Sequence, residues 1–182
     1  MMNIEQFKDW ALFLDRDGVI NRRIPGDYVK NIDDFIFNPG AREAIAIFSG
    51  VFSHIFVVTN QQGIGKGMMN ETDLNIIHDY MLTHINKTGG RIDKIYFCPG
   101  LAKDKPLCRK PQPGMALQAK ADFPDIDFSK SLMIGDSVSD ILFGKNVGML
   151  SVFINHTGEI EDDLPAGTPI YTSLAEIAGI NI

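Results

Sequence analysis

Two aspartates, Asp15 and Asp17, follow a run of four apolar residues near the start of the chain. The run, Ala11 to Leu14, has the length of a buried strand, and residues i and i+2 of a strand face the same way. We therefore expect both carboxylates to point into one pocket where the strand ends. Two like charges held that close favour a divalent hard cation such as Mg²⁺, which would also bind an anionic substrate. The alternative is a solvated turn, since Asp and Gly are common turn residues.

A second apolar run, Ile55 to Val58, leads into a polar segment that could bind phosphate. A threonine hydroxyl and the backbone N–H groups of a turn can hold a tetrahedral oxyanion, and glycine lets the backbone approach it closely. The alternative is a glycine-rich loop without a ligand. The segment consists of Thr59, Asn60, Gln61, Gln62 and Gly63.

A third apolar run, Leu132 to Ile134, also ends in carboxylates, Asp136 and Asp140, four residues apart. Asp136 could complete a metal site with the first pair of aspartates. Asp140 would be a solvated residue or a helix cap, or it would orient a neighbouring lysine. Arg109 and Lys110 supply adjacent cations that could balance phosphate charge, although an isolated pair of this kind is usually solvated.

The elements that must position these residues alternate between strands and helices. This alternation predicts a doubly wound α/β fold with a parallel sheet, in which ligands bind at the carboxyl ends of the strands. The expected strands are 11–14, 55–58, 92–97, 132–134 and 150–154. Helices are expected to begin near Ala41, Glu71 and Met115 and to cover 139–146 and 174–178.

In this order, these strand-end motifs resemble those of the haloacid dehalogenase (HAD) superfamily of phosphatases. Three segments resemble the motifs of the branch that contains D,D-heptose 1,7-bisphosphate phosphatases and histidinol-phosphate phosphatases. They are Asp15-Arg16-Asp17-Gly18, Thr59 to Gly63 and Cys108 to Met115. The resemblance implies an α/β, HAD-like Rossmannoid three-layer sandwich with a central parallel sheet. The intervals between the motifs are too short for a separate cap domain.

The resemblance also implies a covalent mechanism. Asp15 would attack phosphorus and form an aspartyl-phosphate, and Asp17 would protonate the leaving alkoxide and then activate water. Mg²⁺ would be held by Asp15, by the backbone carbonyl of Asp17 and by Asp136, with Asp140 in support. Thr59 and Lys110 would complete the catalytic set. The implied substrate-binding residues are Asn60, Gln61, Gln62, Arg109, Asp27, Tyr28 and Ser137.

The chain departs from this branch at a loop where relatives commonly carry a Cys-x-His and Cys-x-Cys zinc site. Gly100 and Pro106 stand at two of the four ligand positions, and two thiolates cannot make a closed tetrahedral site. We therefore predict no structural zinc. Cys98 and Cys108 are interpreted as free, buried small residues, with a local disulfide as the less favoured alternative.

Size and composition limit the class of protein. The 182 residues predict one domain over the whole chain, and 45% hydrophobic residues are typical of a globular protein. The net charge of -6 argues against a nucleic-acid partner, which would need a basic surface. No apolar stretch approaches the ~18 residues of a membrane span, and no signal peptide is evident, so we expect a cytoplasmic protein without a membrane partner. The unfilled loop region between the motifs favours a monomer.

The leading hypothesis is a Mg²⁺-dependent phosphomonoesterase of the heptose bisphosphate type, acting on a small phosphorylated sugar. Histidinol-phosphate phosphatase is the nearest rival, favoured by the short spacing between Cys98 and Cys108. A nucleic-acid end phosphatase and a noncatalytic phosphosugar-binding protein are further alternatives. Four histidines lie outside the motifs and are interpreted as surface or core residues, with a contact between His156 and substrate as the less favoured alternative. They are His54, His78, His84 and His156.

Overall fold

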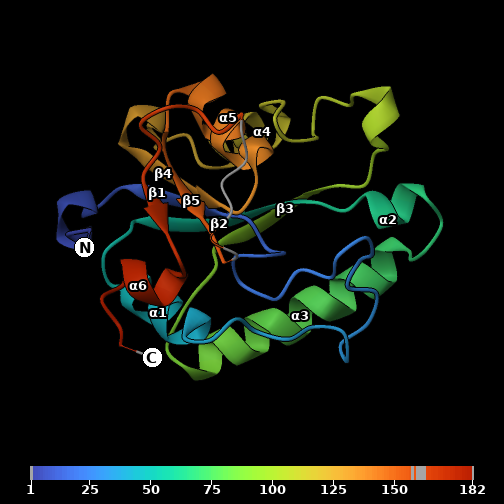
Figure 1. The fold of residues 1–182 in the computed structure, drawn as a ribbon, viewed down its shortest axis with the longest axis horizontal. Coiled ribbons are helices and arrows are strands. Elements are labelled where there is room, and N and C mark those ends of the chain that lie inside the picture. The colour runs from blue at the N-terminus through green and yellow to red at the C-terminus, as the bar shows by residue number, and fades with distance from the viewer. Residues whose placement is uncertain (1, 157, 159–162, 182) are drawn as a thin grey trace.

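The computed structural model describes residues 2–156, 158 and 163–181. One parallel six-stranded sheet, in the order β3-β2-β1-β4-β5-β6, runs through these residues (Figure 1). Its strands are β1 (Ala11–Leu14), β2 (His54–Asn60), β3 (Lys94–Cys98), β4 (Ser131–Gly135), β5 (Leu150–Ile154) and β6 (Ile170–Tyr171).

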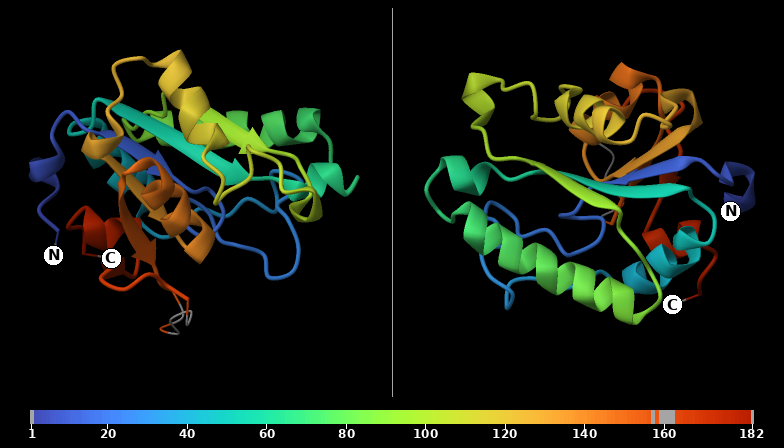
Figure 2. Two further views of the ribbon diagram at one scale, coloured as in Figure 1. Left: turned by 90° about the horizontal axis from the view of Figure 1, so that it is seen from above. Right: turned by 180° about the vertical axis from the view of Figure 1, so that it is seen from behind.

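Helices cover both faces of the sheet, as the three views together show (Figure 2). The α-helices are α1 (Ala41–Ser49), α2 (Gln62–Gly65), α3 (Glu71–Lys87), α4 (Gly114–Asp122), α5 (Val138–Val147) and α6 (Leu174–Ile177). α1, α3 and α6 lie on one face, and α4 and α5 lie on the other. The predicted α/β three-layer sandwich is confirmed.

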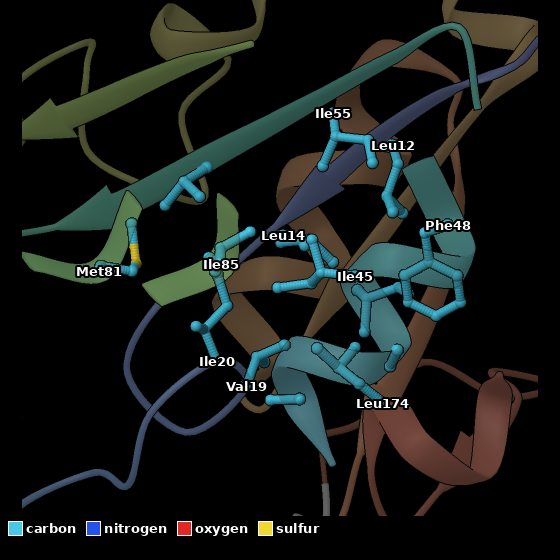
Figure 3. Packing of buried hydrophobic residues seen from close by; sticks show 14 of the residues in the cluster. Leu12, Leu14, Val19, Ile20, Ile45, Phe48, Ile55, Met81, Ile85 and Leu174 are labelled. Atoms are coloured by element: carbon cyan, nitrogen blue, oxygen red, sulfur yellow. The ribbon is translucent and has the colours of Figure 1, made fainter. Parts of the chain in front are cut away.

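The two core clusters follow from the alternation of side chains along the strands. Leu12 and Leu14 of β1 pack in the larger cluster with residues of α1, α3 and α6, such as Phe48 (Figure 3). Ala11 and Phe13 of the same strand face α4 and α5 in the smaller cluster. Because β1 is covered on both faces, all four of its residues are buried.

The longest helix, α3, begins at a reciprocal cap. The Asn70 side chain accepts a hydrogen bond from the backbone N–H of Asp73, and the Asp73 carboxylate accepts one from the N–H of Asn70. The two bonds satisfy N–H groups that a helix start leaves without intrahelical partners. The helix then presents an apolar stripe to the sheet, formed by Leu74, Ile77, Met81 and Ile85.

Strand order places the predicted motifs together. β1 lies between β2 and β4, with Leu14 in register with Val57 and with Ile134. Sequentially adjacent strands continue outward on opposite sides of β1, so the sheet has its topological switch point there. Ligands of open α/β sheets bind outside the carboxyl ends of strands at such a point.

The expected elements are present, with shifts at their ends. The strand expected at 92–97 is observed at Lys94–Cys98, because Asp93 pairs with Ile55 through its backbone and its carboxylate before the ladder begins. The short α2 and β6 were not expected. In the described residues, the long segments 22–38 and 99–113 add only loops and one short 3₁₀ helix, Ala102–Asp104. The extent of a single domain over 1–182 stays a prediction.

Candidate active site

A buried ion-pair cluster lies at the carboxyl end of β1. Lys110 Nζ is 2.7 Å from Asp15 Oδ1 and 2.6 Å from Asp140 Oδ1, and it donates a third contact to the Val58 carbonyl at 2.6 Å. Burial acts to lower the pKa of Lys110, but the carboxylates of Asp140 and Asp15 more than offset this and raise it. Lys110 is therefore a charged lysine at the predicted nucleophile.

Asp15 is set in a low-dielectric environment. Burial raises its pKa to about 6, since Lys110 compensates only part of the desolvation and the nearby Asp140 and Asp17 carboxylates add repulsion. The Lys110 ammonium at 2.7 Å favours the ionised carboxylate of Asp15, which is the form that can act as a nucleophile.

The pKa of Asp17 shifts in the opposite direction. Burial acts to raise its pKa, but Arg16 and the hydrogen bonds from Asn21 and Gln61 outweigh burial and lower it. Arg16 Nη2 donates to both carboxylate oxygens, at 3.1 and 2.9 Å, and Asn21 Nδ2 donates at 2.9 Å. The carboxylate is thus held from several sides while its side chain keeps 22% of its surface exposed.

Asp136 follows β4 and completes a group of carboxylates that could hold a metal ion. One oxygen each from Asp15, Asp136 and Asp140 lies within 4.8 Å of the others. Asp136 Oδ1 is buried without a hydrogen-bond partner among the described residues. At Gly18, whose φ is +99°, a Cβ would lie 1.8 Å from Asp136 Oδ2, so only glycine leaves this oxygen its space.

The donor set fits a hard divalent cation. All available donors are carboxylate oxygens, which suit Mg²⁺ and suit zinc or copper less well. Burial raises the pKa of Asp136 to about 8, with a further contribution from the Asp15 carboxylate, and the half-exposed Arg23 offsets part of this through a 3.3 Å ion pair. A cation would relieve this repulsion. Because Asp140 already binds Lys110 and Ser137, Asp15 and Asp136 are the more available ligands.

The Thr59 segment joins this cluster from β2. Gln61 Nε2 donates to Thr59 Oγ1 and to Asp17 Oδ2, both at 2.9 Å, and Gln61 is fully buried. Asn60 exchanges two hydrogen bonds with the backbone of Lys110, at 3.0 and 3.3 Å. These two amides therefore connect the strand ends, and their contact with substrate stays a prediction.

The remaining predicted substrate-binding residues occupy the rim. Tyr28 Oη accepts a hydrogen bond from Gln62 Nε2 at 2.9 Å, and Lys66 Nζ lies 5.2 Å from the centre of the Tyr28 ring. Arg109 Nη1 is buried without a hydrogen-bond partner in the described part of the chain, so it is available to a ligand. Asp27 is exposed and paired with Lys30 at 2.7 Å.

Ser137 precedes α5 and donates its hydroxyl to Asp140 Oδ2 at 2.6 Å. In this structure it supports Asp140, while its predicted role in substrate binding stays untested.

Three contacts were not expected from the sequence. His156 Nε2 lies 2.6 Å from the carbonyl of Gly18, next to the turn that carries Asp17. Arg16 is fully buried against Asp17, and His78 of α3 lies on the other side of the same guanidinium. Arginine between two aspartates was a visible signal for the Arg16 contact, whereas the sequence separation of 62 residues hid His78.

The interpretation of Cys98 and Cys108 as free residues was wrong. Their sulfurs form a disulfide between the end of β3 and the loop that carries Arg109. Parallel pairing brings Cys98 level with Asn60, and Asn60 holds the backbone of Lys110, two residues beyond Cys108, which explains why the cysteines meet. The predicted absence of structural zinc is not tested by this bond and stays a prediction.

Comparison with known proteins identifies the family. A family model described as HAD-hydrolase-like matches residues 107–177. The D-glycero-alpha-D-manno-heptose-1,7-bisphosphate 7-phosphatase of Mycobacterium tuberculosis is 42% identical over 138 residues, which cover 76% of this chain and 73% of that protein.

The chain belongs to the heptose 1,7-bisphosphate phosphatase family of HAD-like hydrolases. A second family member, named as the same enzyme in Campylobacter jejuni, is 42% identical over 86% of this chain and 88% of its own length. The solved structure of D,D-heptose 1,7-bisphosphate phosphatase from B. bronchiseptica superposes with a TM-score of 0.85 and 31% identity, covering 93% of this chain and 96% of the other. That structure contains magnesium and phosphate. The family resemblance predicted from the motifs is confirmed.

Proposed function

We propose that this chain is a magnesium-dependent phosphomonoesterase that removes the 7-phosphate of D-glycero-D-manno-heptose 1,7-bisphosphate. The observation that carries the catalytic part is the buried contact of Asp15 with Lys110 beside Asp136 and Asp17. The substrate is supported by the names of the relatives, which include 7-phosphatases for both the alpha and the beta anomer.

The first chemical step would use Asp15 as the nucleophile. One Asp15 oxygen attacks phosphorus and forms an aspartyl-phosphate as the bond to the sugar oxygen breaks. Lys110, held at 2.7 Å, balances charge on the nucleophile and on the phosphoryl oxygens. Mg²⁺ held by Asp15 and Asp136, with the carbonyl of Asp17, would neutralise negative charge on phosphate and nucleophile. The Thr59 hydroxyl and the Asn60 N–H would bind phosphoryl oxygens.

Asp17 would handle the proton in both half-reactions. An arriving phosphate places negative charge near its carboxylate, which raises its pKa toward the protonated form and lets it protonate the departing sugar oxygen. The carboxylate left behind then takes a proton from the water that attacks the aspartyl-phosphate. Its hydrogen bonds to Arg16, Asn21 and Gln61 stabilise this ionised form.

The rim would bind the sugar and its second phosphate. Arg109 Nη1 has unused hydrogen-bonding capacity, and a guanidinium matches phosphate oxygens in planar geometry. Tyr28, Asp27, Gln62 and Ser137 complete the proposed substrate contacts.

We further propose that the enzyme works as a cytoplasmic monomer without a nucleic-acid or membrane partner. The net charge of -6 supports the exclusion of nucleic acid. No helix within the described ranges is both long and apolar enough to span a bilayer. Gel filtration at micromolar concentration tests whether the protein is a monomer, and cell fractionation tests whether it is cytoplasmic.

The function is tested by measuring phosphate release from both heptose bisphosphate anomers, histidinol phosphate and nucleotides, with and without Mg²⁺. We expect Mg²⁺-dependent release of one phosphate equivalent from a heptose bisphosphate and a kcat/KM at least tenfold higher than for histidinol phosphate. A preference for histidinol phosphate, the rival favoured by the short Cys98 to Cys108 spacing, would overturn the substrate assignment. Binding without turnover would instead indicate a phosphosugar-binding protein.

A further inference from the structure

Arg16 is a fully buried cation in the turn between the two catalytic aspartates. One edge of its guanidinium faces Asp17, with Nη2 bound to both carboxylate oxygens and Nε 3.4 Å from Oδ1. A charged group without exposure must have its hydrogen bonds satisfied inside the protein. The contact on the far edge therefore limits how the guanidinium can turn, and the guanidinium orients the Asp17 carboxylate together with Asn21 and Gln61.

The far edge is held by His78. Arg16 Nη1 lies 3.2 Å from His78 Nε2, and His78 is 5% exposed within the apolar stripe of α3. Because arginine can only donate, Nε2 must accept, so the imidazole is neutral and carries its proton on Nδ1. Burial, with the Arg16 charge in second place, lowers the pKa of His78 to about 3, in agreement with a neutral ring.

We propose that His78 is a positioning residue that fixes Arg16 and thereby aims the Asp17 carboxylate at the leaving oxygen of the substrate. The chain of contacts runs from α3 to the acid/base group, and it rests on the proposed phosphatase mechanism. His78 itself touches neither substrate nor metal in this account.

The proposal predicts a loss that depends on the leaving group. Without the acceptor at position 78, Arg16 Nη1 is a buried donor without a partner, and the guanidinium turns away from its bidentate geometry with Asp17. Small misplacements of a general acid lower the rate, and an alkoxide leaving group depends on that acid far more than a p-nitrophenolate does. The loss in kcat/KM should therefore be larger for sugar phosphates than for p-nitrophenyl phosphate.

The experiment compares kcat/KM for a heptose bisphosphate and for p-nitrophenyl phosphate in the full-length protein. His78→Leu and His78→Met remove the acceptor, and His78→Gln keeps one near the position of Nε2. His84→Gln is the matched control, because His84 lies on the same helix and its ring contacts the Tyr80 carbonyl. Thermal unfolding of each variant checks that it is folded.

We expect His78→Leu and His78→Met to lose about tenfold or more in kcat/KM on the sugar phosphate, with an unchanged KM, and less than about threefold on the aryl ester. His78→Gln should recover to within about threefold of wild type, and His84→Gln should match wild type. Equal losses on the two esters, or no loss, would refute the positioning role.

If the apolar variants do not fold, the Arg16–His78 contact can be measured directly in the wild-type protein. Nitrogen NMR of the wild-type protein near pH 5 should show a neutral His78 ring with Nε2 unprotonated, and a proton on Nε2 would refute the contact. Failure of the phosphatase assignment gives a different result, since wild type would then release no phosphate from any ester. If only the heptose substrate fails, the comparison is made with histidinol phosphate as the alkyl ester.

Discussion

Asp15 and Asp17 are separated by one residue, yet the protein gives their carboxylates opposite electrostatic surroundings. Burial raises the pKa of Asp15, while Arg16 and amide donors overcome burial and lower that of Asp17. Neighbouring carboxylates with different environments are a common way of separating two roles in one site. The structure thus supports the assignment of nucleophile to one and proton carrier to the other.

Asp136 makes metal binding dependent on pH. Burial and the Asp15 carboxylate raise the pKa of Asp136, so protons compete with Mg²⁺ for this carboxyl group, and Mg²⁺ needs the ionised form. We expect the apparent Mg²⁺ affinity to increase from pH 6 to pH 8, with release of protons on binding. Titration calorimetry in buffers of different ionisation enthalpy measures both quantities.

The control for this titration is Asp136→Asn, which should bind Mg²⁺ weakly and with a smaller pH dependence. An affinity that is flat or decreasing between pH 6 and pH 8 would show that the carboxyl group is not the titrating ligand.

His78 makes a separate contribution to stability. Its pKa is about 3 in the folded chain and about 6.5 when unfolded, so the unfolded state binds more protons between these values. Stability from this group is fully present above pH 6.5 and is lost as the pH falls. When the pH is lowered from 6.5 to 4.5, we expect the unfolding free energy of wild type to fall by about 2 kcal/mol more than that of His78→Gln, as measured by urea denaturation.

That difference is taken relative to each protein's own value at pH 6.5, so the carboxyl groups, which titrate in both, largely cancel. A constant difference across the range would contradict a buried neutral histidine. His84→Gln serves again as the control and should follow wild type.

At the scale of single residues, the sequence predicted the groups that lie directly at strand ends. Asp15, Asp136 and Thr59 could be placed because apolar runs end just before them and parallel strands share one edge. Arg16 and His78 could not be paired, because their contact depends on how α3 packs on the sheet. The spacing of buried residues in α3 indicated which face is inward, and His78 lies on that face.

At the scale of elements, the loop after β3 has more structure than its sequence suggested. The disulfide of Cys98 and Cys108 ties this loop to the sheet, and Asn60 holds Lys110 just beyond it. Two cysteines in an otherwise unremarkable composition gave no reason to prefer a bond over free thiols. Their proximity depends on strand pairing between β2 and β3, which the sequence alone does not report.

The bond should stabilise the protein by restricting the unfolded chain. Closing a loop of this length is worth about 2–3 kcal/mol in the chain-entropy model. We expect Cys108→Ser, or reduction of wild type, to lower the unfolding free energy by that amount in denaturant titrations. Reductant should not affect Cys108→Ser, which is the control.

Thiol titration of the oxidised, denatured wild type should find no free cysteine, and two free thiols would contradict the bond. Metal analysis of the same sample tests the prediction that no stoichiometric zinc is present.

At the scale of the whole molecule, the alternation of strands and helices was sufficient to predict a parallel sheet and its active edge. The order of six strands, with β1 at the switch point, explains why residues from positions 15 to 140 form one site. The short β6 and α2 were missed because segments of two and four residues carry no periodic signal. The similarity to the B. bronchiseptica enzyme extends over 93% of this chain.

The central claim is that Asp15 carries the phosphoryl group during turnover. The most direct measurement is rapid acid quenching of the enzyme with heptose bisphosphate, followed by borohydride reduction and peptide mass spectrometry. Reduction converts a phosphorylated aspartate to homoserine, and we predict that product at position 15, absent without substrate and absent in Asp15→Asn. Homoserine at another aspartate, or full phosphate release by Asp15→Asn, would contradict the account.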